Sequence, residues 1–242
     1  MYGWRGKIGF ISPIVAETSI RAFNEMLPDG VTMAVTCLSI QDFKKEEFAH
    51  SKSQIDRAAE DLARAEVDCI IVVGSPMIYG LDGFGSDKVI IERIEKKWKL
   101  PTTTSQTCQV DALKAMGISK AGMCTVFSAD LTSKKRDFVE RSGIKILAAN
   151  SLNCSNNIEV ANLPPHIAYQ IAKKTYLEAP EIDGLLMHCS QWRNHECIQK
   201  IEDDFGVTVV AGNQSYVWWG LKTLKIKDRI TGYGRLLASL SA

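Results

Sequence analysis

Residues 183–190 read DGLLMHCS, an apolar run of strand length that ends on a thiol, Cys189. Residues 68–75, DCIIVVGS, have the same design and end on Gly74 and Ser75. A short apolar run bounded by polar or turn residues is typical of a strand that is buried on both faces. Both segments therefore predict parallel β-strands, and their spacing along the chain points to the fold.

Eight such runs alternate with helical patterns, and this alternation is typical of α/β proteins with parallel sheets. The fifth, sixth and seventh runs start about 114 residues after the first, second and third, although the two halves share almost no residue identity. This repeat of element order predicts two similar lobes. The runs span residues 7–13, 31–38, 68–75, 100–105, 121–127, 145–151, 183–190 and 206–212.

Gly74 and Cys189 end the third and the seventh run and so occupy corresponding places in the two halves. Open parallel α/β sheets bind ligands at the carboxyl ends of their strands. We therefore expect an α/β fold of two similar Rossmann-like lobes, each with a four-stranded parallel sheet, related by a pseudo-two-fold axis. The active site is expected in the cleft between the lobes. Lobe 1 should comprise residues 1–112 and 213–242, and lobe 2 residues 113–212.

The composition excludes several classes of function. The 242 residues are 45% hydrophobic and carry a net charge of +1, and because no long basic run occurs we expect no nucleic-acid partner. No apolar stretch approaches the length of a membrane span, and the first residues lack the pattern of a signal peptide. We therefore expect a cytoplasmic protein without membrane contact, and leave open a homo-oligomer.

The seven cysteines are an odd number without a C-x-x-C pair, and we expect free thiols rather than disulfides. His188, Cys189, His195 and Cys197 have the residue types of a metal cluster. Adjacent strand residues point to opposite faces, however, so no metal site is expected there.

The glycines of residues 79–87, YGLDGFGSD, are in the wrong order for a dinucleotide fingerprint. They predict a loop beside the cleft, with Ser86 capping the helix that follows.

Taken together, these segments resemble the aspartate/glutamate racemase superfamily, and within it the branch of arylmalonate decarboxylase and maleate cis-trans isomerase. The resemblance spans nearly the whole chain. It rests on the two-lobe pattern, on GSP after the third run and HCSQ after the seventh, on IGFISPIVAETS (8–19), on residues 100–122 and on TGYGRLL (231–237). It implies a small carboxylic acid as substrate and chemistry without a metal or organic cofactor.

In this superfamily two cysteines, one from each lobe, typically flank a carbon that bears a carboxylate, whereas the decarboxylases keep only the second. Gly74 with Cys189 matches the decarboxylase pattern. The resemblance thus implies cofactor-independent decarboxylation of a malonate-type, arylmalonate-like acid through an enediolate, protonated on one face by Cys189. A racemase or cis-trans isomerase of a small carboxylic acid, a cysteine-dependent hydrolase of a small amide or imide, and a non-catalytic acid sensor remain alternatives.

Groups that bind the carboxylate and the developing oxyanion are expected beside both strand ends. Backbone N–H groups at strand-to-helix junctions attract anions, and the hydroxyls of Ser75 and Ser190 lie next to them in sequence. The resemblance implies that Ser75 and Pro76 bind the retained carboxylate. A helix over residues 190–206 would start beside Cys189 and lower the pKa of its thiol.

The resemblance also implies which residues line the pocket. Pro13 and its neighbour Ile14 are expected in its wall, and Asn157 matches a carboxylate-binding asparagine. Phe127 stands where the family has a tyrosine, so its hydroxyl is missing; either Ser128 substitutes for it or the substrate presents an apolar group there. His188 is expected as a buried, hydrogen-bonded neighbour. The isomerases have an asparagine where this chain has Ala16, which argues against maleate-like diacids as substrates.

Overall fold

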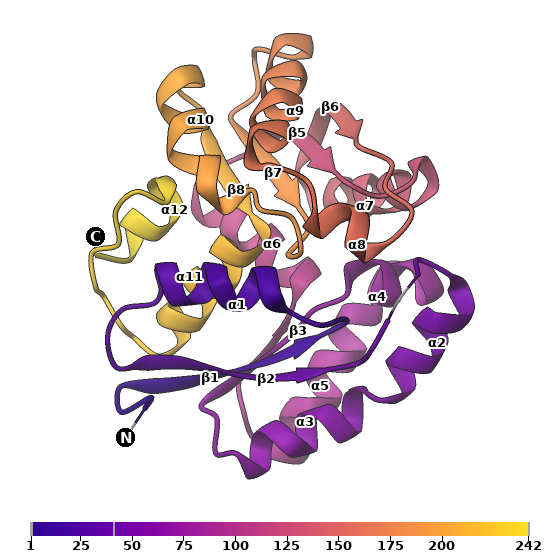
Figure 1. Ribbon diagram of the computed structural model, residues 1–242, viewed down its shortest axis with the longest axis vertical. Coiled ribbons are helices and arrows are strands. Elements are labelled where there is room, and N and C mark those ends of the chain that lie inside the picture. Colours follow the sequence, from indigo (N-terminus) through magenta and orange to yellow (C-terminus); the bar gives the residue numbers. More distant parts are fainter. Residues whose placement is uncertain (1, 41, 242) are drawn as a thin grey trace.

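The computed structural model describes residues 2–40 and 42–241 and contains two four-stranded sheets (Figure 1). Their strand orders, β2-β1-β3-β4 and β6-β5-β7-β8, correspond, and all pairs are parallel. The predicted α/β fold with two similar sheets is thereby confirmed. The strands are β1 (Gly6–Ser12), β2 (Val31–Cys37), β3 (Cys69–Val72), β4 (Thr102–Thr104), β5 (Lys120–Thr125), β6 (Lys145–Ser151), β7 (Gly184–His188) and β8 (Thr208–Ala211).

Helices follow nearly every strand and cover the sheets, as parallel connections require (Figure 1). Around the first sheet lie α1 (Glu17–Met26), α2 (Lys45–Ser53), α3 (Ile55–Arg64), α4 (Ser75–Asp82), α5 (Ser86–Trp98) and α6 (Ser105–Ala115). The remaining helices are α7 (Ala129–Arg141), α8 (Asn157–Ala161), α9 (Pro165–Glu178), the 3-10 turn η1 (His195–Cys197), α10 (Ile198–Phe205), α11 (Gly212–Thr223), α12 (Gly234–Ala238) and η2 (Ser239–Ser241).

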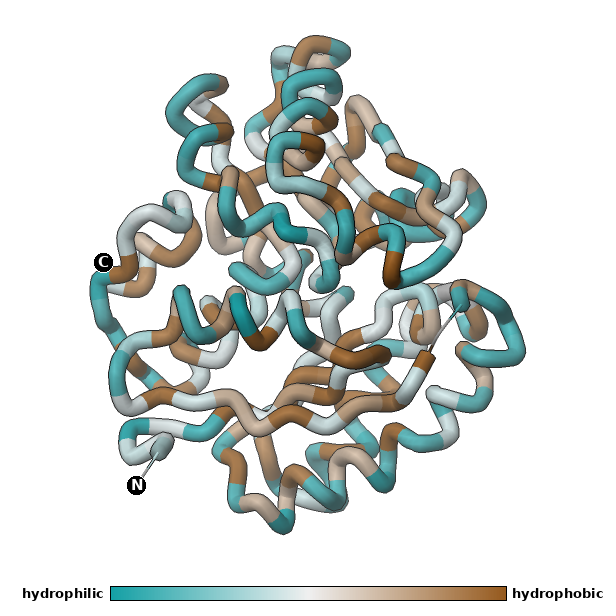
Figure 2. The backbone as a smooth tube through the Cα atoms, in the orientation of Figure 1, coloured by the Kyte–Doolittle hydropathy of each residue, from teal (hydrophilic) through white to brown (hydrophobic). Residues whose placement is uncertain are grey.

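The inner strands β3 and β7 are fully buried, which explains their continuous apolar sequences. In Figure 2 the hydrophobic segments follow the strands, whereas the outer helices are largely hydrophilic. The register pairs Ile11 with Val72 and Thr125 with His188. Gly74 and Cys189 therefore come just after the carboxyl ends of the two inner strands.

The last part of the chain contacts both sheets. α11 directly follows β8 but packs against α1, α6 and β3 of the first sheet. A Cβ atom at Gly220 would overlap the side chain of Ile8, so glycine permits this close approach of α11 to β1. α12 packs instead against β8 and α10. The lobe limits at residues 112/113 and 212/213 stay a prediction.

The predicted loop over residues 79–87 is wrong in its extent. Residues 79–82 complete α4, and a short turn leads into α5 at Ser86. Ser86 Oγ donates to the carbonyls of Ile78 (3.1 Å) and Gly83 (2.8 Å), and no side chain caps α5. The hydroxyl thus closes the turn between the two helices instead of capping the second. Within the described ranges, no helix is both long and apolar enough to cross a membrane.

One lysine is completely buried. Lys135 of α7 is 0% exposed, and its Nζ donates to the side-chain oxygens of Gln106 and, at 3.0 Å, Gln109, both on α6. Burial lowers the pKa of Lys135 to about 7, because a charge in the interior loses its hydration.

This burial makes stability depend on pH. Between the folded pKa of Lys135, about 7, and its unfolded value, about 10.4, only the unfolded chain holds the proton, so the stability contributed by this group rises with pH. From pH 7 to pH 9 the free energy of unfolding should increase by on the order of 2 kcal/mol more in the wild type than in Lys135→Met. Urea unfolding of both proteins at the two pH values measures this difference. Equal increases would contradict it.

Candidate active site

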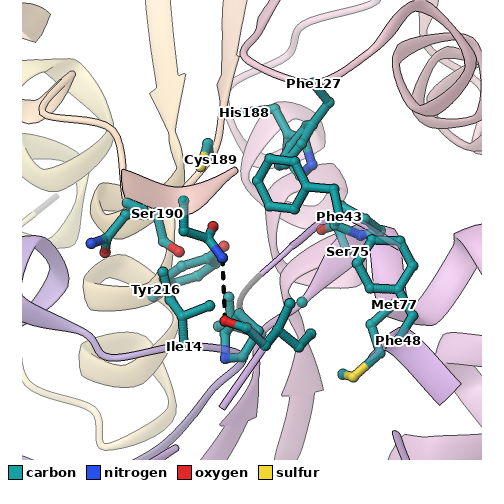
Figure 3. Close-up of a pocket in the computed structure, with 17 residues that line it drawn as sticks. Ile14, Phe43, Phe48, Ser75, Met77, Phe127, His188, Cys189, Ser190 and Tyr216 are labelled. Carbon is teal, nitrogen blue, oxygen red and sulfur yellow. Dashed lines mark hydrogen bonds between the residues drawn. The ribbon is translucent and has the colours of Figure 1, made fainter. Parts of the chain in front are cut away.

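A pocket lies between the carboxyl ends of the two sheets and takes side chains from both (Figure 3). Its cavity has a volume of about 40 Å³. Ten of the eleven residues proposed for the site line it: Pro13, Ile14, Gly74, Ser75, Pro76, Phe127, Asn157, His188, Cys189 and Ser190. Further lining residues are Ile40, Phe43, Phe48, Val73, Met77, Gln191 and Tyr216.

Gly74 shapes the first-lobe side of the pocket. Its φ of +126° lies in the region that favours glycine, and α4 starts immediately after it. A Cβ atom at this position would lie 2.9 Å from Met77 Cε and 3.4 Å from Pro13 Cβ. At the start of α4, Pro76 lacks an N–H, and Ser75 Oγ is 2.7 Å from Ser105 Oγ in a buried hydrogen bond. The wall here combines a bare backbone with a fixed hydroxyl.

Cys189 lies on the second-lobe side and is only 8% exposed. Its thiol accepts hydrogen bonds from the backbone N–H groups of Gln191 and Trp192, which lower its pKa, but the larger effect of burial raises that pKa to about 12. The start of the helix expected over residues 190–206 is wrong: residues 190–194 form bends and loop, η1 starts at His195, and only the later part is helical, as α10. The expected lowering of the pKa by a helix start is therefore wrong as well.

The loop after Cys189, residues 190–194, is held by helices α11 and α1. Asn213 Nδ2 of α11 donates to the carbonyl of Ser190 at 2.8 Å, and Ser19 Oγ of α1 donates to the same oxygen at 3.3 Å. Gln191 Nε2 also donates to Glu17 Oε1 at 2.6 Å. These contacts fix the backbone that presents N–H groups to the sulfur.

A cluster of rings forms another part of the wall. The ring of Phe127 lies 5.2 Å from that of Phe43 and 5.5 Å from that of His188, measured between centroids (Figure 3). His188 Nδ1 is 2.8 Å from Gln109 Oε1. Burial and the nearby Lys135 hold the pKa of His188 well below its ordinary 6.5, so its ring is neutral.

Ser128 does not join the pocket. Its Oγ accepts the backbone N–H of Leu131 at 3.4 Å and caps the start of α7. The expectation that this hydroxyl replaces the missing tyrosine is therefore wrong. The end of β5 presents only the apolar ring of Phe127 to the pocket.

Asn157 connects the two sides of the pocket. Its Nδ2 donates to the carbonyl of Ile40 at 3.5 Å, drawn as the dashed line in Figure 3. Asp42 and Asn156 form an isolated antiparallel bridge next to it. The Asn157 amide thus contacts backbone across the pocket rather than a second polar side chain.

Sequence reasoning missed the aromatic side chains Phe43 and Phe48, although they were visible as isolated apolar residues in the polar stretch 42–54. It also missed Lys135 and Gln109, which support His188 from behind. Lys135 gave no signal, since it sits in a charged stretch that is typical of a solvent-facing helix.

The residues with metal-ligand types are separated. His195 Nε2 contacts Glu25 Oε2 at 3.2 Å, whereas His188 faces Gln109. Cys197 Sγ donates to the carbonyl of Asn194 at 3.3 Å. In the part of the chain that the structure describes, no three His, Cys, Asp or Glu side chains are placed to hold a metal ion.

The chain is similar to proteins of a known family over nearly its whole length. Residues 8–237 match the family model described as "Amdase: Arylmalonate decarboxylase". Among curated proteins, a maleate isomerase of Geobacillus stearothermophilus is 24% identical, with 96% of this chain and 97% of that protein covered. An arylmalonate decarboxylase of Bordetella bronchiseptica is also 24% identical, over 57% of this chain and 58% of that protein.

Among solved structures, a mutant of Nocardia farcinica maleate cis-trans isomerase with a covalently bound succinylcysteine intermediate superposes with a TM-score of 0.89. The two sequences are 20% identical, and the match covers 97% of this chain and 98% of that one. At this identity, the similarity shows a shared fold.

The buried thiol of Cys189 should react slowly with alkylating agents. With a pKa of about 12, its thiolate is on the order of one part in 10⁴ at pH 8, and this fraction rises about tenfold per pH unit. Iodoacetamide labelling, followed by peptide mass spectrometry between pH 7 and pH 10, should show this continuous rise at Cys189. A plateau below pH 9 would show that the pKa is near neutral instead.

Substitution of Gly74 should destabilise the fold more than substitution of a solvent-side glycine. Gly74→Ala places a Cβ at φ +126° against Met77, whereas Gly83→Ala has φ +74° and no atom within 4 Å of its Cβ. We expect a loss of about 1 kcal/mol for Gly83→Ala and about 2–3 kcal/mol for Gly74→Ala, measured by urea unfolding. Equal losses would mean that Met77 and Pro13 exert no constraint.

Proposed function

Because the chain belongs to the arylmalonate decarboxylase family, we propose that it removes CO2 from malonate-type acids without a cofactor. The observation that carries this proposal is the single thiol: Cys189 lines the pocket together with Gly74, where a second side chain is absent. One proton donor on one side of a planar intermediate gives a product of one handedness.

The proposed reaction has two steps. The bond between the α-carbon and one carboxylate breaks, CO2 leaves, and its electron pair forms an enediolate with the remaining carboxylate. The α-carbon then takes the proton of Cys189, and the resulting thiolate is stabilised by the N–H groups of Gln191 and Trp192 until water returns a proton. A pKa of about 12 suits this role, since the thiol is protonated at neutral pH.

The two carboxylates of a malonate would meet different surroundings. The start of α4 at Ser75 and the loop after Cys189 offer backbone N–H groups and hydroxyls to the retained carboxylate. Phe43, Phe48 and Phe127 offer no hydrogen bond to the other carboxylate. An ion that loses hydration without compensation is destabilised, and departure as neutral CO2 relieves this.

A maleate-type isomerase is the second candidate, because full-length curated relatives carry that name. Two features of the pocket argue against it. Gly74 removes one of the two cysteines that the isomerases use, and Phe127 lacks a hydroxyl for a second carboxylate. A hydrolase with Cys189 as nucleophile is disfavoured, because a thiol with a pKa of about 12 forms little thiolate.

The decisive experiment is turnover in heavy water. A panel of malonates, from methylmalonate to 2-methyl-2-phenylmalonate, should release CO2 and gain one deuterium at the α-carbon, in one enantiomer where the product is chiral. Cys189→Ser should lower kcat by at least about 100-fold, since its hydroxyl is a much weaker acid. Carbon dioxide release and NMR of the product measure both effects.

Cys37→Ser provides the matched control, because Cys37 is a free cysteine at the end of β2 outside the pocket lining. Its turnover should equal that of the wild type. Conversion of maleate to fumarate without CO2 release would replace the proposal with isomerisation, and full activity of Cys189→Ser would remove the role of the thiol.

A further inference from the structure

A buried chain of hydrogen bonds leads from α7 to the pocket wall. Lys135 Nζ donates to Gln109 Oε1 at 3.0 Å, and the same oxygen lies 2.8 Å from His188 Nδ1. Gln106 Oε1 is a second acceptor for the lysine. All four side chains are at most 2% exposed, so water does not compete for these contacts. The proposed decarboxylation makes no use of this chain.

The geometry fixes the tautomer of His188. An amide oxygen only accepts hydrogen bonds, and Gln109 Oε1 is oriented by the amino group of Lys135. Nδ1 of His188 must therefore carry the hydrogen that it donates to this oxygen. Because the ring is neutral, its other nitrogen, Nε2, has a lone pair and no hydrogen.

That lone pair has no partner within residues 2–40 and 42–241, although Nε2 is buried. His188 lines the pocket, and the rings beside it, Phe127 and Phe43, cannot donate a conventional hydrogen bond (Figure 3). A buried acceptor without a donor loses the free energy of its hydration. A ligand that brings an O–H or N–H to this wall restores the missing bond, whereas a carboxylate there would face the lone pair.

We infer that His188 Nε2 accepts a hydrogen bond from a hydroxyl substituent of the substrate, so that the preferred acids are α-hydroxy rather than α-methyl acids. This inference rests on the proposed function only for the malonate part of the substrate. The selection itself is a property of binding. Lys135 and Gln109 act as positioning residues, since they fix the orientation and the tautomer of the imidazole in the pocket wall.

The first test compares ligands that differ only by hydroxyl and methyl. Mandelate and 2-phenylpropionate, the products of two matched phenylmalonates, are titrated into the protein by calorimetry. Mandelate should bind about tenfold or more tightly, because a site with a buried acceptor discriminates against a ligand without the donor. Equal affinities, or tighter binding of 2-phenylpropionate, would overturn the inference.

This design separates the two proposals. If mandelate is preferred but neither 2-hydroxy-2-phenylmalonate nor 2-methyl-2-phenylmalonate loses CO2, the decarboxylase proposal fails and the role of His188 stands. If both malonates lose CO2 with equal kcat/KM and the two products bind equally, the decarboxylase proposal stands and the proposed role of His188 fails.

The second test uses variants. His188→Phe keeps an aromatic ring but has no acceptor, so the ratio of the two affinities should fall from about tenfold to about one. His166→Phe, at an exposed position of α9, is the matched control and should keep the wild-type ratio. An unchanged ratio in His188→Phe would overturn the inference.

A third measurement needs no substitution at His188 itself. Nitrogen-15 NMR of the histidine rings distinguishes the protonated ring nitrogen from the bare one. In the wild type, the hydrogen of His188 should be on Nδ1, and in Lys135→Met a fraction of the rings should shift it to Nε2, with a smaller preference for mandelate. A wild-type hydrogen on Nε2 would overturn the inference, even if the variants at position 188 failed to fold.

Discussion

The site depends on the attachment of the loop after β7 to helices α1 and α11. The carbonyl of Ser190 accepts hydrogen bonds from Asn213 and Ser19, and Gln191 contacts Glu17. Without these contacts, the backbone N–H groups of Gln191 and Trp192 would not be held at the sulfur of Cys189. Burial raises the pKa of this thiol, and the two N–H groups lower it, so the pKa of Cys189 depends on where this loop is held.

The pocket combines an apolar front with a polar support. The rings of Phe43, Phe48 and Phe127 line the pocket, while Gln109 and Lys135 lie behind His188. Low polarity strengthens every hydrogen bond that remains, and it also makes each unpaired group unfavourable. Specific binding in such a pocket is therefore expected to depend on a few polar atoms.

The strands could be predicted because they follow from short-range patterns, whereas most of the pocket lining was predicted from the resemblance to a family. Eight short runs, two of which end at Gly74 and Cys189, predicted the eight strands, and the repeat of element order predicted the two sheets. The prediction for the surroundings of Cys189 was wrong, because a polar segment after a strand is compatible with either a helix or a loop. The residues that hold this segment as a loop, Asn213 and Ser19, are distant from it in sequence. The role of Ser128 was predicted wrongly because a serine at a strand end can either bind a ligand or cap a helix. Here its hydroxyl caps α7.

The burial of Lys135 could not be predicted from the sequence, because it depends on another helix. A charged side chain on a helix is usually exposed unless a neighbouring helix supplies hydrogen-bond acceptors, and here α6 supplies them.

The packing of α11 on the first sheet has a consequence for biosynthesis. This helix follows β8 in the chain but covers α1, α6 and β3, which are made much earlier. On the ribosome, the N-terminal sheet thus lacks this one helix until the last strand of the other half has been made. The carbonyl that Asn213 contacts is likewise left without this partner until then. The cleft is consequently assembled only as synthesis ends, so that Cys189 of a nascent chain lacks the helix that supports its loop until the chain is nearly complete.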